Sequence, residues 1–175
     1  KLSPLVEEKY RLFNSDIYLK LAENNIKIFK YYELTKKKKK RIDKYFEDEI
    51  FPILTPLAID NVHPFPNLIN RSIALAILLD DPDTEAIEEK LSVVQVPSNI
   101  VPRFYQIEGR EENSFILLED IILANIDKLF PGMATVGVTS FRITRNADLE
   151  LEEEEAADLL TLIEEEVKKR RLGLL

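Results

Sequence analysis

The stretch SIALAILL, at residues 72–79, decides the fold of this chain. Seven of its eight residues are apolar, and no charged residue interrupts it. A continuous apolar run of this length is typical of a strand that is covered on both faces. The turn-forming sequence DDPD at residues 80–83 follows, and a second, Val-rich segment at residues 91–96 comes next. We therefore predict a central strand with a neighbouring strand, in a sheet that helices cover.

Apolar residues at helical spacing and short β-branched runs lie on both sides of this pair. Helices are predicted at residues 2–21, 35–51 and 119–130, and over the last apolar stripe at residues 156–167. Further strands are predicted at residues 26–32, 104–107, 114–117 and 135–144. In the last of them the apolar phase slips between Val138 and Phe141, which indicates a bulge or a later start of the strand. Because several strands follow one another without a helix, the predicted fold class is α+β. It is a mixed, largely antiparallel sheet packed with helices and preceded by one amphipathic helix.

The composition limits the chemistry that the chain can perform. Its 175 residues are 45% apolar and contain no Cys, which excludes disulfides, Cys-based zinc sites and Cys nucleophiles. The net charge of −8 is unlike that of a free-standing nucleic-acid binder, so no nucleic-acid partner is expected. No stretch approaches the length of a membrane span, and a cytoplasmic location is the default prediction.

Both ends of the chain indicate a piece of a longer protein. The sequence begins with Lys1 inside a predicted helix and ends with an apolar LGLL at residues 172–175. The apolar stripe of the helix at residues 2–21 needs a partner, since an isolated helix of this length is marginal in water. We expect that helix to belong to a preceding helical domain.

Five consecutive lysines, Lys36–Lys40, occupy the first turns of the second predicted helix, for which Thr35 is the predicted N-cap. Positive charge at a helix N-terminus opposes the helix dipole by a few tenths of a kcal/mol per residue. The sequence favours a solvated face here, and a patch that contacts an anion is the alternative.

Candidates for catalysis are few. His63 is the only histidine, and its flanking prolines favour a packed loop residue over a base. Asp80, Asp81 and Asp83 lack the Gly and the distal Glu of a calcium loop. No glycine-rich phosphate-binding loop and no nucleophile elbow is present.

Arg142 and Arg145 lie close together near the end of a predicted strand. Guanidinium groups bind phosphate or carboxylate through paired hydrogen bonds. An ion pair with Asp148, Glu150 or a partner chain is the alternative use of these two arginines.

Four segments together resemble the head region of the long bacterial polyphosphate kinases. They are YFEDEIFPILTPLAIDNVHPFP at residues 45–66, VPSNIVPRF at 96–104, LFPGM at 129–133 and FRITRNADLELEEEEAADLL at 141–160. The resemblance covers nearly the whole chain. It implies that residues 1–24 are the last helix of the N-terminal helical domain. Residues 25–175 would then be the α+β head domain, truncated at its C-terminal end.

The resemblance also implies a reaction, in which the terminal phosphate of ATP is transferred reversibly to polyphosphate with Mg²⁺. The catalytic histidines of that family would lie beyond Leu175 and its adenine-contacting asparagine before Lys1. His63 belongs to the HPFP motif and does not match the phosphorylated histidine. No catalytic, nucleotide or metal residue, and no cofactor, is therefore predicted within this chain; ATP and Mg²⁺ belong to the parent enzyme.

The expected role is a non-catalytic one: scaffolding, dimerisation and framing of the polyphosphate tunnel. Expected partners are the other domains of the parent chain, a second subunit in a homodimer or higher homo-oligomer, and polyphosphate in the parent. Arg142 and Arg145 are the candidates for interface or anion contacts, and Phe65 and Phe104 for structural anchors. A stand-alone interaction module of unrelated function is the alternative, and a nucleotide- or polyphosphate-binding module is a third. Membrane association of the parent enzyme stays open.

Overall fold

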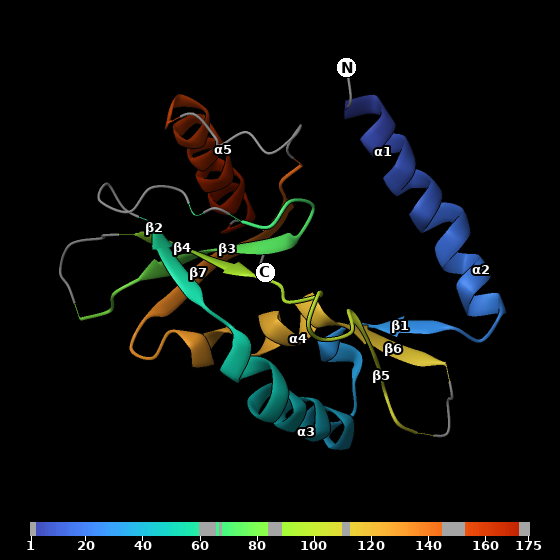
Figure 1. Cartoon of the computed structure of the whole chain (residues 1–175). Coiled ribbons are helices and arrows are strands. Elements are labelled where there is room, and N and C mark those ends of the chain that lie inside the picture. Colours follow the sequence, from blue (N-terminus) through green and yellow to red (C-terminus); the bar gives the residue numbers. More distant parts are fainter. Residues whose placement is uncertain are drawn as a thin grey trace.

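Two β-sheets, with helices on both faces of the larger one, make up the chain in this computed structural model (Figure 1). The structure describes residues 3–59, 66, 68–83, 89–109, 113–144 and 153–171. The helices are α1 (Ser3–Leu12), α2 (Tyr18–Glu23), α3 (Lys36–Tyr45), α4 (Leu118–Ala124) and α5 (Glu153–Arg171). Short π- or 3₁₀-helical turns lie at Phe13–Ile17, Tyr31–Glu33, Phe46–Ile50, Phe51–Ile53 and Ile126–Leu129. The strands are β1 (Lys27–Phe29), β2 (Pro56–Ile59), β3 (Ile73–Asp80), β4 (Lys90–Gln95), β5 (Phe104–Gln106), β6 (Ser114–Leu117) and β7 (Ala134–Arg142).

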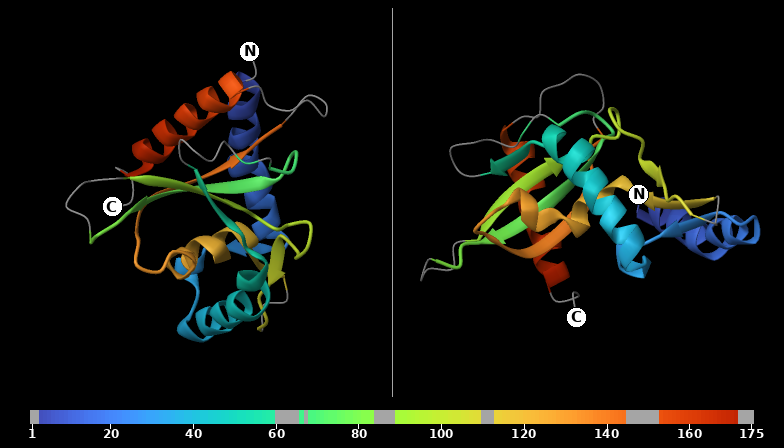
Figure 2. Two further views of the ribbon diagram at one scale, coloured as in Figure 1. Left: turned by 60° about the vertical axis from the view of Figure 1, so that its left-hand side comes forward. Right: turned by 90° about the horizontal axis from the view of Figure 1, so that it is seen from below.

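Strand β3 is central in the larger sheet, as the apolar run at residues 72–79 predicts. The strand order is β2-β4-β3-β7, and every pair is antiparallel. Successive side chains of a strand point to opposite faces. Leu75, Ile77 and Leu79 accordingly join one apolar core. Ala74, Ala76 and Leu78 join another. Figure 2 shows α5 on one face of this sheet and α3 and α4 on the other.

A second, smaller sheet has the order β1-β6-β5. Its β1–β6 pair is parallel and its β5–β6 pair is antiparallel. The α+β class and the mixed, largely antiparallel pairing are therefore confirmed. The separation into two sheets was not predicted, because the pairing of β1 with β6 joins residues far apart in the chain.

The core between the sheets and α3 depends on one face of that helix. The Thr35 hydroxyl accepts a hydrogen bond from the Lys38 amide at 3.4 Å, which confirms the predicted N-cap. Ile42, Phe46 and Ile50, spaced four residues apart, are at most 1% exposed. They pack against side chains of β3, β6 and α4 in the same core.

Three local predictions were wrong. The helix predicted at residues 119–130 ends at Ala124. The backbone of Asn125 has a non-helical ψ of 17°, and its side chain donates a hydrogen bond to the Ile121 carbonyl oxygen at 3.1 Å, which ends the helix. Strand β2 lies in a segment for which no strand was predicted. The irregularity in β7 lies opposite Leu78 and Leu79, nearer the start of the strand than predicted. The apolar phase changes along β7 because both of its faces are covered: Val138 packs into one core and Phe141 into the other.

The N-terminal helical segment projects from the body of the molecule (Figure 1). It is helical from Ser3 to Glu23 and ends before Asn25, whose positive φ of 58° is the left-handed conformation that commonly follows a helix C-terminus. Its apolar side chains are exposed, among them Leu5 at 67%, Tyr10 at 59% and Ile17 at 46%. This stripe has no cover within the described part of the chain.

Helix α5 lies so close to β7 that Gly137 is required there. A Cβ at this position would lie 2.9 Å from Val167 Cγ1 and 3.3 Å from the Val167 carbonyl oxygen. Val167 is fully buried, so it has no room to move away. We expect Gly137→Ala to lower the free energy of unfolding by about 1–2 kcal/mol, as overpacking in a core does. Urea denaturation measures the change.

Gly109→Ala is the matched control for this experiment, since among the described residues its added Cβ meets only Lys38 Cε, at an ordinary 3.7 Å. Equal stability of the Gly137→Ala protein and the unchanged chain would contradict the close approach of α5 to β7.

Candidate functional site

The structure describes one of the two arginines that the sequence singles out. Arg142 is the last residue of β7, lies opposite Ile73 of β3 and is exposed. Arg145 lies outside the described residues, and so do His63 and Phe65. The pairing of Arg142 with Arg145 stays a prediction. Phe104, the other expected structural anchor, is 49% exposed and meets the ring of Phe115 edge to face at a centroid distance of 6.5 Å, so its anchoring role stays a prediction.

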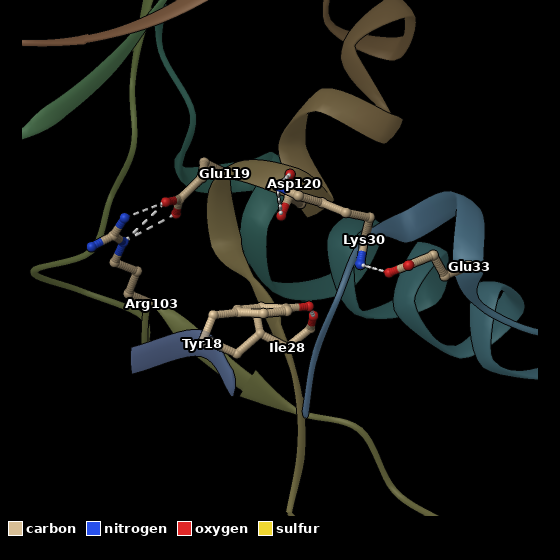
Figure 3. A network of polar contacts seen from close by, with 7 residues as sticks. All are labelled: Tyr18, Ile28, Lys30, Glu33, Arg103, Glu119 and Asp120. Atoms are coloured by element: carbon tan, nitrogen blue, oxygen red, sulfur yellow. Dashed lines mark hydrogen bonds and ion pairs between the residues drawn. The ribbon is translucent and has the colours of Figure 1, made fainter. Parts of the chain in front are cut away.

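An Arg–Glu ion pair joins the segment before β5 to the start of α4. Arg103 Nε donates to Glu119 Oε1 at 3.0 Å and to Oε2 at 3.2 Å, and its Nη2 also contacts Oε1 (Figure 3). Glu119 is only 9% exposed. The Arg103 carbonyl also accepts from the Leu118 amide at 2.8 Å. The hydrogen bond to Glu119 raises the pKa of Arg103, so the guanidinium stays charged.

A neighbouring pair ties the smaller sheet to the same helix. Lys30 Nζ lies 3.1 Å from both carboxylate oxygens of Asp120, whose side chain is 13% exposed (Figure 3). Burial raises the pKa of Asp120, and the hydrogen bond from Lys30 opposes that rise. The Lys30 amide donates to the Glu33 carboxylate at 2.6 Å, and the Tyr18 hydroxyl donates to the Ile28 carbonyl at 3.4 Å. Each carboxylate here already has a cation or an amide as its partner. These contacts therefore hold α4 and the smaller sheet in position and leave none of these carboxylates free to react.

A hollow of about 310 Å³ lies between α3 and β5. The rings of Tyr45 and Tyr105 lie against each other there, with centroids 4.3 Å apart and a tilt of 31° between their planes. Burial raises the pKa of both phenols, so neither hydroxyl serves as a base near neutral pH. Arg41 pairs with Glu108 at 2.8 Å and Lys44 with Asp48 at 2.7 Å, so these cations on the lining have acidic partners.

The exposed cationic side chains of α3 form a patch that we call the basic face. Its members are Lys36, Lys37, Lys40, Arg41 and Lys44. Lys38 and Lys39 are half-buried instead, because their ammonium groups lie over the rings of Phe29 and Tyr31. Within the residues that the structure describes, no group of His, Cys, Asp and Glu side chains is arranged to hold a metal ion. No described helix is both long enough and apolar enough to span a bilayer.

Comparison with known proteins assigns the chain to a family. Residues 37–175 match the family model of the polyphosphate kinase middle domain. The chain belongs to the polyphosphate kinase family. It is 45% identical over 99% of its length to a polyphosphate kinase of Bacillus cereus, of which it covers 25%. It is 42% identical over 98% of its length to one of Aphanizomenon baltica, of which it covers 46%. The crystal structure of polyphosphate kinase from Porphyromonas gingivalis superposes with a TM-score of 0.74 at 27% identity, over 82% of this chain and 22% of that one.

The resemblance seen in the sequence is thereby confirmed, and the chain spans a quarter to a half of the length of these relatives. Within the part that matches the polyphosphate kinase middle domain, sequence reasoning missed the pairing of Arg103 with Glu119. Arg103 stands in one of the four segments that carry the resemblance, which was the available signal. Glu119 and Asp120 stand at the start of a predicted helix, and nothing in that pattern indicates their partners, which come from distant segments.

Proposed function

We propose that this chain is the middle part of a polyphosphate kinase, an enzyme that reversibly transfers the terminal phosphate of ATP to polyphosphate with Mg²⁺. The observation that carries the proposal is similarity along 97–99% of the chain to proteins named polyphosphate kinase, of which it covers only a part. The same match favours this function over an unrelated interaction module. Residues 1–24 would belong to the preceding helical domain and residues 25–175 to the head domain.

This part of the enzyme acts as a scaffold rather than as the catalyst. Phosphoryl transfer depends on concentrated positive charge, metal ions and a positioned nucleophile. The buried carboxylate of Glu119 and the partly buried carboxylate of Asp120 are instead neutralised by Arg103 and Lys30. The paired sheets, the two cores and these ion pairs make a packed body suited to holding other domains in place.

The exposed apolar stripe on α1 and α2 supports a contact with other parts of the same enzyme or with a second subunit in a homo-oligomer. Contiguous exposed apolar surface marks interaction sites. Arg142 and Arg145 are proposed to contact a second subunit or the polyphosphate chain at the end of β7. The cytoplasm is the proposed location.

Polyphosphate synthesis tests the proposal. The purified chain, given ATP and Mg²⁺, should make no polyphosphate, whereas the longer protein that contains it should. Synthesis by the chain alone would refute the scaffold role, and a longer protein that makes none would refute the kinase assignment. In that longer protein, Arg142→Glu with Arg145→Glu should reduce either self-association in sedimentation or the rate of synthesis. Lys90→Glu, a charge reversal at the exposed start of β4, is the control that should change neither.

A further inference from the structure

The basic face on α3 concentrates positive charge on one helix of an otherwise acidic chain. Seven of the nine residues 36–44 are Lys or Arg, although the chain carries a net charge of −8. The buried face of α3 uses Ile42 and Phe46, and the basic face lies away from them. The run from position 36 to position 44 rises about 12 Å along the helix axis, which suits an extended ligand better than a single phosphate.

The placement of these charges works against the helix itself. Lysines crowd the N-terminus of α3, and Glu47, Asp48 and Glu49 follow its last turn. Each charge at the wrong end of a helix costs a few tenths of a kcal/mol. Helix α5 has the opposite arrangement, with acidic residues at its start and basic residues at its end. Helix stability therefore explains the charges of α5 but not those of α3, and such local conflicts concentrate at functional sites.

The lysines at the start of the basic face are available to a ligand. Lys36, Lys37 and Lys40 make no ion pair with any residue that the structure describes. Two nearby acids are already engaged: Asp43 accepts from the Tyr31 hydroxyl at 2.7 Å, and Glu47 pairs with Lys128 at 2.6 Å. The screening length is about 8 Å at physiological salt, so the distant acidic residues do not cancel this local field.

We propose that the basic face docks linear inorganic polyphosphate. This inference rests on the proposed function, since that function supplies the polyanion. Single-stranded nucleic acid is the competing polyanion, but it binds largely by stacking its bases on aromatic rings. The rings of Phe29 and Tyr31, which lie beside the basic face, are covered by the ammonium groups of Lys38 and Lys39 at 5.3 and 5.1 Å.

Equilibrium titration of labelled polyphosphate against the purified protein, without ATP, tests the docking. The test variant is Lys36→Gln, Lys37→Gln, Lys40→Gln, and Gln preserves helix propensity. We expect binding at least tenfold weaker at about 50 mM salt. The slope of log K against log salt should also be smaller by about 2, since each phosphate that a lysine no longer neutralises reduces it by about 0.7.

The matched control is Lys9→Gln, Lys20→Gln, Lys90→Gln, which removes the same charge from exposed lysines elsewhere. It should bind within twofold of the unchanged protein. Equal losses in both variants, or no loss in the test variant, would overturn the inference. So would single-stranded DNA of matched charge that binds as tightly as polyphosphate and loses the same affinity in the test variant.

This outcome is separable from that of the proposed function. A protein that synthesises polyphosphate while its test variant binds normally refutes only the docking surface. A protein that makes none but loses polyphosphate binding in the test variant refutes only the kinase assignment.

Discussion

Replacing Phe46 by Ala is expected to lower the free energy of unfolding by about 4 kcal/mol, near the middle of the range for a buried aromatic residue. Phe46 is 0% exposed and lies in the core that joins α3 to β3, β6 and α4. Its ring meets Phe51 edge to face at a centroid distance of 5.9 Å, and Lys128 Nζ lies 5.8 Å from its centroid. The substitution removes these contacts and leaves a cavity among elements that cannot all move inward. Urea denaturation monitored by circular dichroism measures the loss.

Phe104→Ala is the matched control, because it removes the same side chain from a position that is 49% exposed. That ring makes an edge-to-face contact with Phe115 at 6.5 Å, and water already reaches much of it. We expect its cost to be below about 1 kcal/mol, as for substitutions away from the core. Similar losses in the two variants would mean that α3 does not cover the sheet as described.

The elements of the larger core were predictable because each carries its own local signal. The apolar run at residues 72–79 has no polar face, which only a strand covered on both sides can accommodate. Ile42, Phe46 and Ile50 recur at helical spacing behind Thr35, which is a strong N-cap residue. Local pattern and tertiary environment agree at these positions, so the sequence alone identifies what is buried.

The arrangement of the smaller sheet depends on contacts between distant segments and has no such signal. Strand β1 is three residues long and pairs in parallel with β6, whose residues lie more than eighty positions later. Strand β2 begins at Pro56, and its own four residues carry no clear strand pattern. It becomes a strand because it pairs with β4. The polar pairs follow the same rule, since Lys30 and Asp120 are 90 residues apart.

The basic face, too, was only partly predictable from the sequence. The lysine run was visible in the sequence, and the preferred interpretation was a solvated face. Only the structure separates Lys38 and Lys39, held over aromatic rings, from Lys36, Lys37 and Lys40, which are exposed. No spacing rule predicts that division, because the two rings lie on a preceding strand and turn.

Arg103→Met is expected to lower the free energy of unfolding by about 2–3 kcal/mol, because it leaves a buried carboxylate without its partner. Glu119 has a side chain only 12% exposed, so water replaces the guanidinium only in part. The Arg103 side chain is itself 38% exposed, which places the expected cost below that of a fully buried pair. Met keeps much of the apolar stem of the side chain, so the measured loss reports mainly on the charge.

Two further variants separate the ion pair from general packing. Arg41→Met breaks another Arg–Glu pair, between side chains that are 52% and 78% exposed, and should cost less than about 1 kcal/mol. Adding Glu119→Gln to Arg103→Met removes the unpaired charge and should restore part of the lost stability. If the double variant is instead less stable than Arg103→Met alone, the cost does not come from a buried charge. The pair between β5 and α4 would then contribute through side-chain packing, and the scaffold would not depend on its electrostatics.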